Sequence, residues 1–423
     1  MAGTRGYRLI PNVIGASLSV LILASIALAA SVDIMPVSEI RPGMTGYCLT
    51  TLKGFEPERL ELEILGVEGT GPQTYGILFL GTDDKFKRFG ILHGMSGSPC
   101  YVNGKLIGAL SYGGFAEKEP IGGITPIEEM LSVLQAPVTA ESKRSSGGFF
   151  AAKAAGHEAY LDERGRFRLP LRVDAIENFG QGSAGIEILG ATGSGSPALS
   201  QLVGAKLRPI PLSFVSSWAG ANDLLGDLGF ESVHSSSPDP VVVAPESLRP
   251  GCPLGSVLVT GDMNLSGMGT LTYIDGDTIL AYGHSAYNAG SVSYPMCSGI
   301  VHTGFPSYLY SYKMTSSSQP LGVITQDRSP AIAGKIGVKP DLLPAEVWLS
   351  NAASDESRRF HFETIRDRYF TPVLLALVAD YCVSTYQHDS GMLTLDWQIL
   401  VALKDRAPIE LTDSYSNFDY GFG

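Results

Sequence analysis

The chain has 423 residues and a net charge of −12, with 44% hydrophobic and 17% charged residues. This length exceeds that of one ordinary domain, and the apolar content is enough for folded cores, which excludes disorder throughout. The acidic balance, without a Lys/Arg stripe, argues against nucleic acid as a partner. Fifty glycines and 26 prolines are typical of a turn-rich β protein.

The N-terminus has the order of a secretory signal peptide. Arg5 and Arg8 precede an apolar run from Val13 to Ala30, which ends in the small-residue pattern Ala27-Leu28-Ala29. We therefore predict a signal peptide over residues 1–30 and an extracytoplasmic location: secreted, periplasmic or in the cell envelope. The alternative is an uncleaved membrane anchor, because the run is nearly long enough to span a bilayer.

The sequence offers no metal-binding pattern. It contains neither CxxC nor HExxH, so we expect no metal and no other cofactor. In an oxidising compartment one or two disulfides could form and leave one thiol over. The five cysteines are Cys48, Cys100, Cys252, Cys297 and Cys382.

The segment 94–99 reads GMSGSP and precedes an Asn103-Gly104 pair between two apolar runs. Asn-Gly favours a type I′ turn, so we predict a β-hairpin here. A serine between glycines can lie on a tight turn that exposes its hydroxyl. The N–H groups of Gly94 and Ser96 would then form an oxyanion hole. Taken alone, the pattern fits an ordinary tight loop equally well.

Two blocks of the sequence resemble one known family. The first is GMSGSP with its NGK hairpin, and the second is GTLTYIDGDTILAYGH over residues 269–284. Both resemble the SpoIVB-type serine peptidases (sporulation stage IV protein B), whose catalytic base is the His after the GTLT hairpin. The resemblance implies Ser96 as nucleophile and His284 as base. His93 is nearer to Ser96 in sequence, but residues so close on a strand-to-turn segment rarely face each other.

The acidic member of the triad is less well defined. The family places its Asp shortly before the Ser turn, which corresponds to Asp83, with Asp84 as the alternative. Three further carboxylates stay open: Asp262, Asp277 and Asp327. In the sporulation peptidase the His block precedes the Ser block, whereas here Ser96 comes first. This order implies a permuted or rebuilt arrangement in which two distant parts of the chain pack together.

We predict a mostly β fold, a chymotrypsin-like double β-barrel, permuted or rebuilt, with a few helices. A polar loop is expected at residues 81–84. A helix is expected after Thr125, with Thr125 as its cap, and a second type I′ turn at Asp275-Gly276. The predicted segments are a signal peptide (1–30), a Ser-bearing β unit (31–137), a Gly/Ser-rich region of unknown role (138–244), a His-bearing β unit (245–345) and a C-terminal α+β segment (346–423), which could be incomplete.

These features predict an exported serine endopeptidase that hydrolyses a protein or peptide substrate with a Ser/His/Asp triad. Self-cleavage is a further hypothesis, since the linker over residues 145–148 offers an accessible site. The alternative is a catalytically inactive binding or regulatory module on a peptidase scaffold. Contact with a membrane is expected only if the N-terminal segment stays uncleaved, and the sequence predicts no oligomeric state.

Overall fold

The computed structural model describes residues 32–69, 75–114, 118–137, 160–161, 167–168, 186–187, 206–221, 233–235, 240–308, 311–351, 356–368, 370–386 and 391–420. The predicted signal peptide, the linker over residues 145–148 and most of the Gly/Ser-rich region lie outside the described residues. Asp33–Gly423 form one compact unit.

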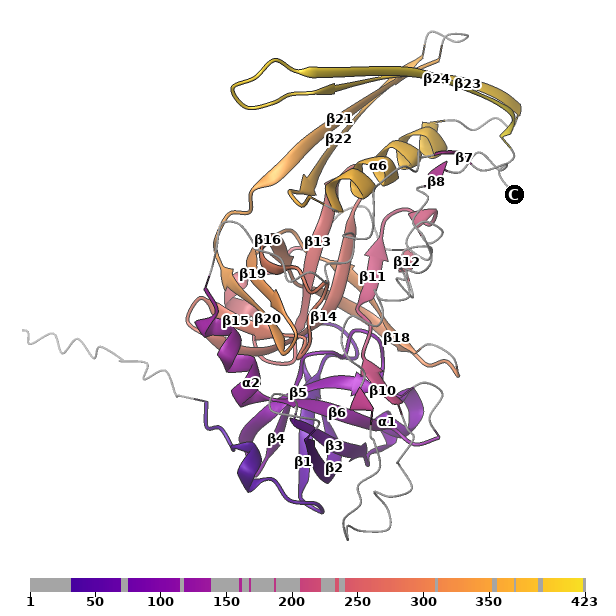
Figure 1. The fold of residues 1–423 in the computed structure, drawn as a ribbon. Helices are drawn as coiled ribbons and strands as arrows, with labels where there is room; N and C mark the ends of the chain where they lie inside the picture. The colour runs from indigo at the N-terminus through magenta and orange to yellow at the C-terminus, as the bar shows by residue number, and fades with distance from the viewer. Residues whose placement is uncertain are drawn as a thin grey trace, which may run out of the picture. The chain divides into compact units, whose positions relative to one another are not determined.

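The first half of this unit is a closed antiparallel barrel (Figure 1, indigo to magenta). Its strands follow the order β4-β1-β2-β3-β6-β5, and pairing of β4 with β5 closes the ring. Alternation explains the core, because Leu60, Leu62 and Ile64 on β2 are buried and Glu61 between them is exposed. The strands are β1 (Thr45–Thr50), β2 (Glu58–Gly69), β3 (Tyr75–Gly81), β4 (Ser98–Val102), β5 (Lys105–Gly113) and β6 (Ile121–Pro126).

The second half contains another ring of six antiparallel strands, in the order β14-β15-β20-β19-β16-β13, which pairing of β13 with β14 closes. The fold is therefore a mostly β double barrel, as the sequence predicts. The strands are β13 (Pro253–Gly261), β14 (Leu265–Asp275), β15 (Thr278–Ala281), β16 (Gly290–Cys297), β19 (Gly322–Arg328) and β20 (Ala331–Ile336).

Strands outside the rings extend both barrels. From the expected middle region, β10 (Lys206–Pro209) pairs with β5, and β11 (Ser213–Ser216) pairs with β14. On the other edge, β22 (Ser357–Ile365) pairs with β13 and with β21 (Leu342–Ser350). The remaining elements are η1 (Val37–Glu39), α1 (Asp84–Phe89), α2 (Ile127–Ser132), η2 (Val133–Gln135), β7 (Tyr160–Leu161), β8 (Phe167–Arg168), β9 (Ile186–Glu187), β12 (Val233–Ser235), η3 (Pro245–Ser247), β17 (Gly299–Phe305), β18 (Tyr312–Ser317), α6 (Phe370–Tyr386), β23 (Gly391–Val401) and β24 (Ile409–Tyr420).

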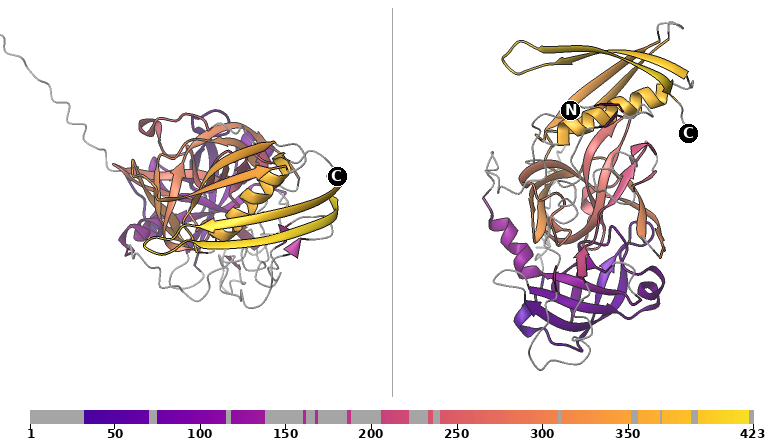
Figure 2. Two further views of the ribbon diagram at one scale, coloured as in Figure 1. Left: turned by 90° about the horizontal axis from the view of Figure 1, so that it is seen from above. Right: turned by 45° about the vertical axis from the view of Figure 1, so that its right-hand side comes forward.

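Two local predictions are wrong at helix starts. Helix α1 occupies residues 84–89 and so begins at the last residue of the expected polar loop, because Asp83 caps it by accepting the N–H of Phe86. Thr125 does not cap α2: it lies in β6, and its hydroxyl donates to the carbonyl of Gly283 in the second barrel. Helix α6 packs against β21 and β22 (Figure 2). Among the described residues, no helix is long and apolar enough to span a bilayer.

The two predicted hairpins form, with one difference in turn type. Asn103 and Gly104 both have positive φ, 52° and 77°, which confirms the type I′ turn. In the second hairpin Asp275 pairs with Thr278, so the turn residues are Gly276 and Asp277. Only Gly276 has positive φ, as in a type II′ turn. The turn therefore lies one residue further along the chain than predicted.

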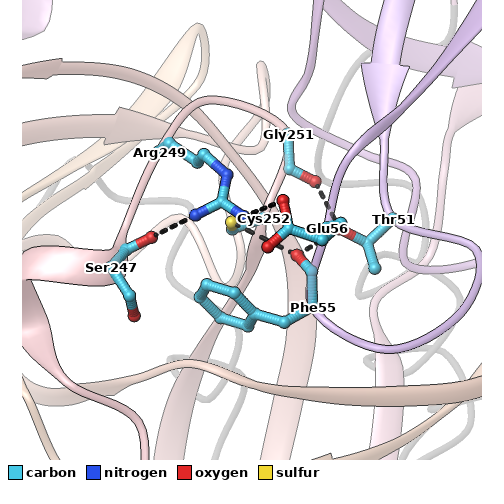
Figure 3. A network of polar contacts seen from close by, with 7 residues as sticks. All are labelled: Thr51, Phe55, Glu56, Ser247, Arg249, Gly251 and Cys252. Atoms are coloured by element: carbon cyan, nitrogen blue, oxygen red, sulfur yellow. Dashed lines mark hydrogen bonds and ion pairs between the residues drawn. The ribbon is translucent and has the colours of Figure 1, made fainter.

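A loop of the first barrel docks onto the segment that leads into β13 (Figure 3). The N–H and the hydroxyl of Thr51 both donate to the carbonyl of Gly251 at 3.1 Å. Arg249 pairs with Glu56 and also donates to the carbonyl of Ser247 at 3.0 Å. These contacts join the loop after β1 of the first barrel to the segment before β13 of the second barrel.

Gly251 is the position of this junction least able to accept a side chain. Its φ is +94°, and an added Cβ would lie 2.8 Å from Cβ of Pro57 and 3.0 Å from Cβ of Leu49. We expect Gly251→Ala to lower the free energy of unfolding by about 2–4 kcal/mol, measured by urea denaturation. Gly104→Ala is the control, because φ is +77° there but nothing lies within 4 Å. Equal losses in the two variants would contradict a steric role for Gly251.

Candidate active site

The Ser96 turn lies between the two barrels and contacts both of them. Ser96 is fully buried and lies just before β4, between Gly94 and Gly97, whose φ values are +85° and +96°. The N–H of Gly97 donates to the carbonyl of Leu110 at 2.8 Å, and the carbonyl of Ser96 accepts from Thr270 N–H at 2.8 Å. An added Cβ on Gly97 would lie 2.0 Å from the carbonyl oxygen of Thr270, so only glycine fits.

The proposed oxyanion donors differ in availability. The N–H of Gly94 donates to the carbonyl of Pro211 at 3.1 Å, so this predicted donor is already engaged. The N–H of Ser96 makes no hydrogen bond within the part of the chain that the structure describes. Of the two predicted groups, only the Ser96 N–H is open to an oxyanion in this state.

His284 follows β15 on a strained turn. Tyr282 and Gly283 before it both have φ of +71°, a conformation that is costly for a bulky residue such as tyrosine. An added Cβ on Gly283 would lie 1.8 Å from Oγ of Ser111 on β5. The Thr125 hydroxyl donates to the Gly283 carbonyl at 2.6 Å. The first barrel therefore contacts the residue next to His284 from two of its strands.

His284 is buried, with only 4% of the residue exposed. Its Nδ1 lies 2.7 Å from the carbonyl oxygen of Ser285, which assigns the proton of the neutral ring to Nδ1 and leaves Nε2 as an acceptor. Burial lowers the pKa of His284 below its ordinary value of 6.5, and the carbonyls of Ser285 and Ile210 oppose this shift. A neutral ring with a free Nε2 is the form that a general base requires.

Two atoms of this region lack hydrogen-bond partners. They are Oγ of Ser96 and Nε2 of His284, which belong to a set of five such buried side-chain atoms among the described residues. They are not bonded to each other in this structure. The residues next to Ser96 and His284 nevertheless contact adjacent positions of β5. Gly97 is hydrogen-bonded to Leu110, and Gly283 contacts Ser111. Unpaired buried polar atoms are rare enough to need an explanation.

Asp83 and Asp84 have partners elsewhere. The two carboxylate oxygens of Asp83 accept the N–H groups of Phe86 at 2.8 Å and Glu61 at 3.0 Å. Asp84 is exposed and pairs with Lys87 at 3.4 Å. Neither is bonded to His284, so the structure does not join the two halves of the predicted triad through these residues. Asp262 accepts the N–H of His361, and Asp277 pairs with Lys335 at an exposed site.

Asp327 on β19 is the carboxylate most closely connected with His284. It is fully buried and accepts the N–H groups of Ala286 at 2.6 Å, Tyr287 at 2.8 Å and Ala289 at 3.1 Å. Burial raises its pKa to about 6. Asp327 therefore holds the loop that directly follows His284. The only sequence signal is an acidic residue within a β-prone run, and that signal does not reveal its partners.

We expect Asp327→Asn to destabilise the protein, because an amide group places an N–H donor against the backbone N–H donors of this loop. Loss of a buried charged acceptor costs about 2–4 kcal/mol in the free energy of unfolding. Urea denaturation measures this loss, with the exposed Asp277→Asn as the control. Equal stability of the two variants would show that the loop does not depend on the Asp327 carboxylate.

Comparison with known proteins identifies one family. Residues 21–131 match a family model described as SpoIVB peptidase S55. This range contains the Ser96 turn and Asp83, and it ends in α2, before the His-bearing barrel. No curated protein and no solved structure matches the chain.

Proposed function

We propose that Ser96 and His284 form the catalytic pair of this chain, for which the match of residues 21–131 to the SpoIVB peptidase family indicates a serine peptidase, a hydrolase of protein substrates. The first barrel supplies the nucleophile and the second supplies the base. This division is the one used by double-barrel serine peptidases, which place catalytic residues on both barrels.

In the proposed reaction His284 Nε2 takes the proton of the Ser96 hydroxyl while Oγ attacks a peptide carbonyl carbon. The Ser96 N–H donates to the oxyanion that develops. His284 then gives the proton to the leaving amine, which breaks the peptide bond and leaves an acyl group on Ser96. Water, deprotonated by the same imidazole, releases the acyl group and restores the hydroxyl.

The observation that carries this proposal is that the two reacting atoms are both buried and both unpaired. Such atoms cost free energy unless a later partner uses them. Catalytic hydrogen bonds are often absent without substrate and form in the Michaelis complex. We infer that substrate entry opens the interface around Ser96 and brings Oγ within 2.6–3.2 Å of Nε2.

Three finer features belong to the same proposal. Export rests on the predicted signal peptide, and endopeptidase action rests on the family. Self-cleavage at residues 145–148 stays a hypothesis. By the family pattern the acid of the triad is Asp83. This role would require Asp83 to give up its hydrogen bonds from backbone N–H groups and to accept one from His284 instead. If it does not, the carbonyl of Ser285 fixes the tautomer of His284 in its place.

A fluorophosphonate probe tests the proposal. The purified protein is incubated with the probe and digested, and the modified residue is identified by mass spectrometry. We expect modification of Ser96 in the folded protein and none after urea denaturation. Absence of labelling in a folded sample would favour the inactive binding module. Labelling of Ser98 in place of Ser96 would show that Ser98 is the nucleophile and that the assignment of Ser96 is wrong.

A further inference from the structure

A lysine side chain lies inside the protein directly behind the Ser96 turn. Lys313 on β18 is 2% exposed, and its Nζ donates to the Thr50 hydroxyl at 2.7 Å and to the Thr270 hydroxyl at 3.2 Å. Its backbone N–H donates to the carbonyl of His93 at 3.1 Å. An added Cβ on Gly94 would lie 3.6 Å from Cδ of Lys313. The lysine thus lies against the start of the turn.

The two threonines connect the amine to opposite ends of the turn. The Thr270 hydroxyl, on β14, donates to the carbonyl of Gly94 at 2.8 Å. The Thr50 hydroxyl, on β1, is hydrogen-bonded to Oγ of Ser98 at 2.9 Å. Ser98 in turn donates to the carbonyl of Met95 at 2.6 Å. One nitrogen atom is therefore linked to the residues on both sides of Ser96.

We propose that Lys313 is a positioning residue for Ser96, whose buried amine braces the Gly94–Ser98 turn through Thr50 and Thr270. The inference rests on the proposed function of Ser96. It adds a residue from the second half of the chain that would set the shape of the turn without touching the substrate. A salt bridge does not explain this lysine, because it pairs with no carboxylate among the described residues.

The brace is complete with a neutral amine. An NH₂ group has two N–H bonds, and the two threonine oxygens accept both of them. The titratable groups that face Lys313 are the thiols of Cys48 on β1 and Cys252 before β13. Burial raises the pKa of Cys252 to about 11, so that this thiol supplies no counter-charge near neutral pH.

Burial lowers the pKa of Lys313 to about 7 from its usual 10.5. Below pH 7 the folded protein must hold an uncompensated ammonium group behind the turn, which favours rearrangement of the brace. We therefore expect the Ser96 turn to be best ordered above pH 7. Between pH 7 and 10.5 the unfolded chain binds more protons at Lys313 than the folded chain does, so stability rises with pH in this window.

The test compares wild type, Lys313→Met and the exposed-site control Lys335→Met. The rate of fluorophosphonate labelling of Ser96 is measured from pH 5.5 to 9, after circular dichroism has confirmed folding. We expect the wild-type rate to rise through an inflection near pH 7. Lys313→Met should lose this inflection and label at least tenfold more slowly at pH 8, while Lys335→Met follows wild type.

A second measurement does not depend on activity. Urea unfolding at pH 7 and 8.5 should show that the unfolding constant of wild type falls roughly tenfold relative to that of Lys313→Met, because only wild type has a lysine that must release its proton on folding, and this release costs less as the pH rises. If Lys313→Met does not fold, Thr270→Val removes one arm of the brace and should slow labelling with the amine still present.

The outcomes separate the two proposals. If wild type is folded and Ser96 is not labelled at any pH, the proposed function is wrong, and the unfolding experiment alone then decides whether the buried amine is neutral. If Ser96 is labelled but folded Lys313→Met retains both the wild-type rate and the wild-type pH profile, the positioning role is overturned. A slower rate with an unchanged pH profile would also overturn it, since that result indicates only a packing defect.

Discussion

Replacement of Ser96 by alanine should abolish fluorophosphonate labelling and lower the rate of protein hydrolysis by roughly 10⁴ to 10⁶-fold. The substitution removes the proposed nucleophile, and no other described side chain bonds to its hydroxyl. The free energy of unfolding should therefore change little or rise slightly, because an unsatisfied buried hydroxyl is lost. Hydrolysis of fluorescently labelled casein and urea denaturation measure the two effects.

A matched control for this variant is Ser266→Ala. The Ser266 hydroxyl on β14 is likewise buried without a hydrogen-bond partner, but it lies outside the Ser96 turn. We expect the control to retain wild-type activity. Activity that persists in Ser96→Ala would show that the nucleophile lies elsewhere in the chain. Equal loss in both variants would indicate that removing a buried hydroxyl damages the core in general.

Substitution of His284 by glutamine should have an effect of similar size, about 10⁴ to 10⁶-fold on hydrolysis, because Ser96 then lacks a proton acceptor. In the proposed mechanism, activity of the wild type needs the neutral imidazole of His284. Burial lowers the pKa of His284, so the ring stays neutral at pH 6.5 and loses its function only in more acidic solution. Beyond the inflection near pH 7 expected from Lys313, the pH profile of casein hydrolysis should therefore show a further decline in more acidic solution, and this second decline should persist in Lys313→Met.

Two other histidines serve to test the assignment of the base. His302→Gln is the neutral control, since His302 on β17 contacts the hydroxyl of Ser316. His93→Gln separates the two candidates near Ser96. Burial lowers the pKa of His93 to about 4, so this ring is also neutral at pH 7. Loss of activity in His93→Gln, with normal activity in His284→Gln, would transfer the role of base to His93.

The features that sequence analysis predicted correctly are local ones. The Asn103-Gly104 turn forms as expected, because two adjacent residues with positive φ are determined by residue type alone. The alternation in β2 follows from the period of a strand with one buried face. The capping interaction of Asp83 is also local, whereas the sequence was interpreted as a polar loop with a candidate catalytic carboxylate at this position. The signal for α1 in the sequence is an Asp before a short run that contains two phenylalanines.

The remaining features depend on contacts between residues distant in sequence. Asp327 is bonded to the loop after His284, and Lys313 lies behind a turn more than two hundred residues upstream. The pairing of β11 with β14 likewise joins segments that are distant in sequence. No periodicity or motif encodes such partners, because each of these residues is compatible with many surroundings until the barrels close.

The order of the two barrels along the chain has a consequence for synthesis. A ribosome completes the first barrel, with its serine, before any strand of the second exists, and domains fold from the N-terminus onward as they emerge. According to the proposal, a chain that is still being synthesised therefore has its nucleophile but not its base. The base is present only after β14, β15 and His284, which follows them, have been synthesised. If Ser96 and His284 are the catalytic pair, a chain still being made therefore cannot hydrolyse a peptide bond before its second barrel has been synthesised.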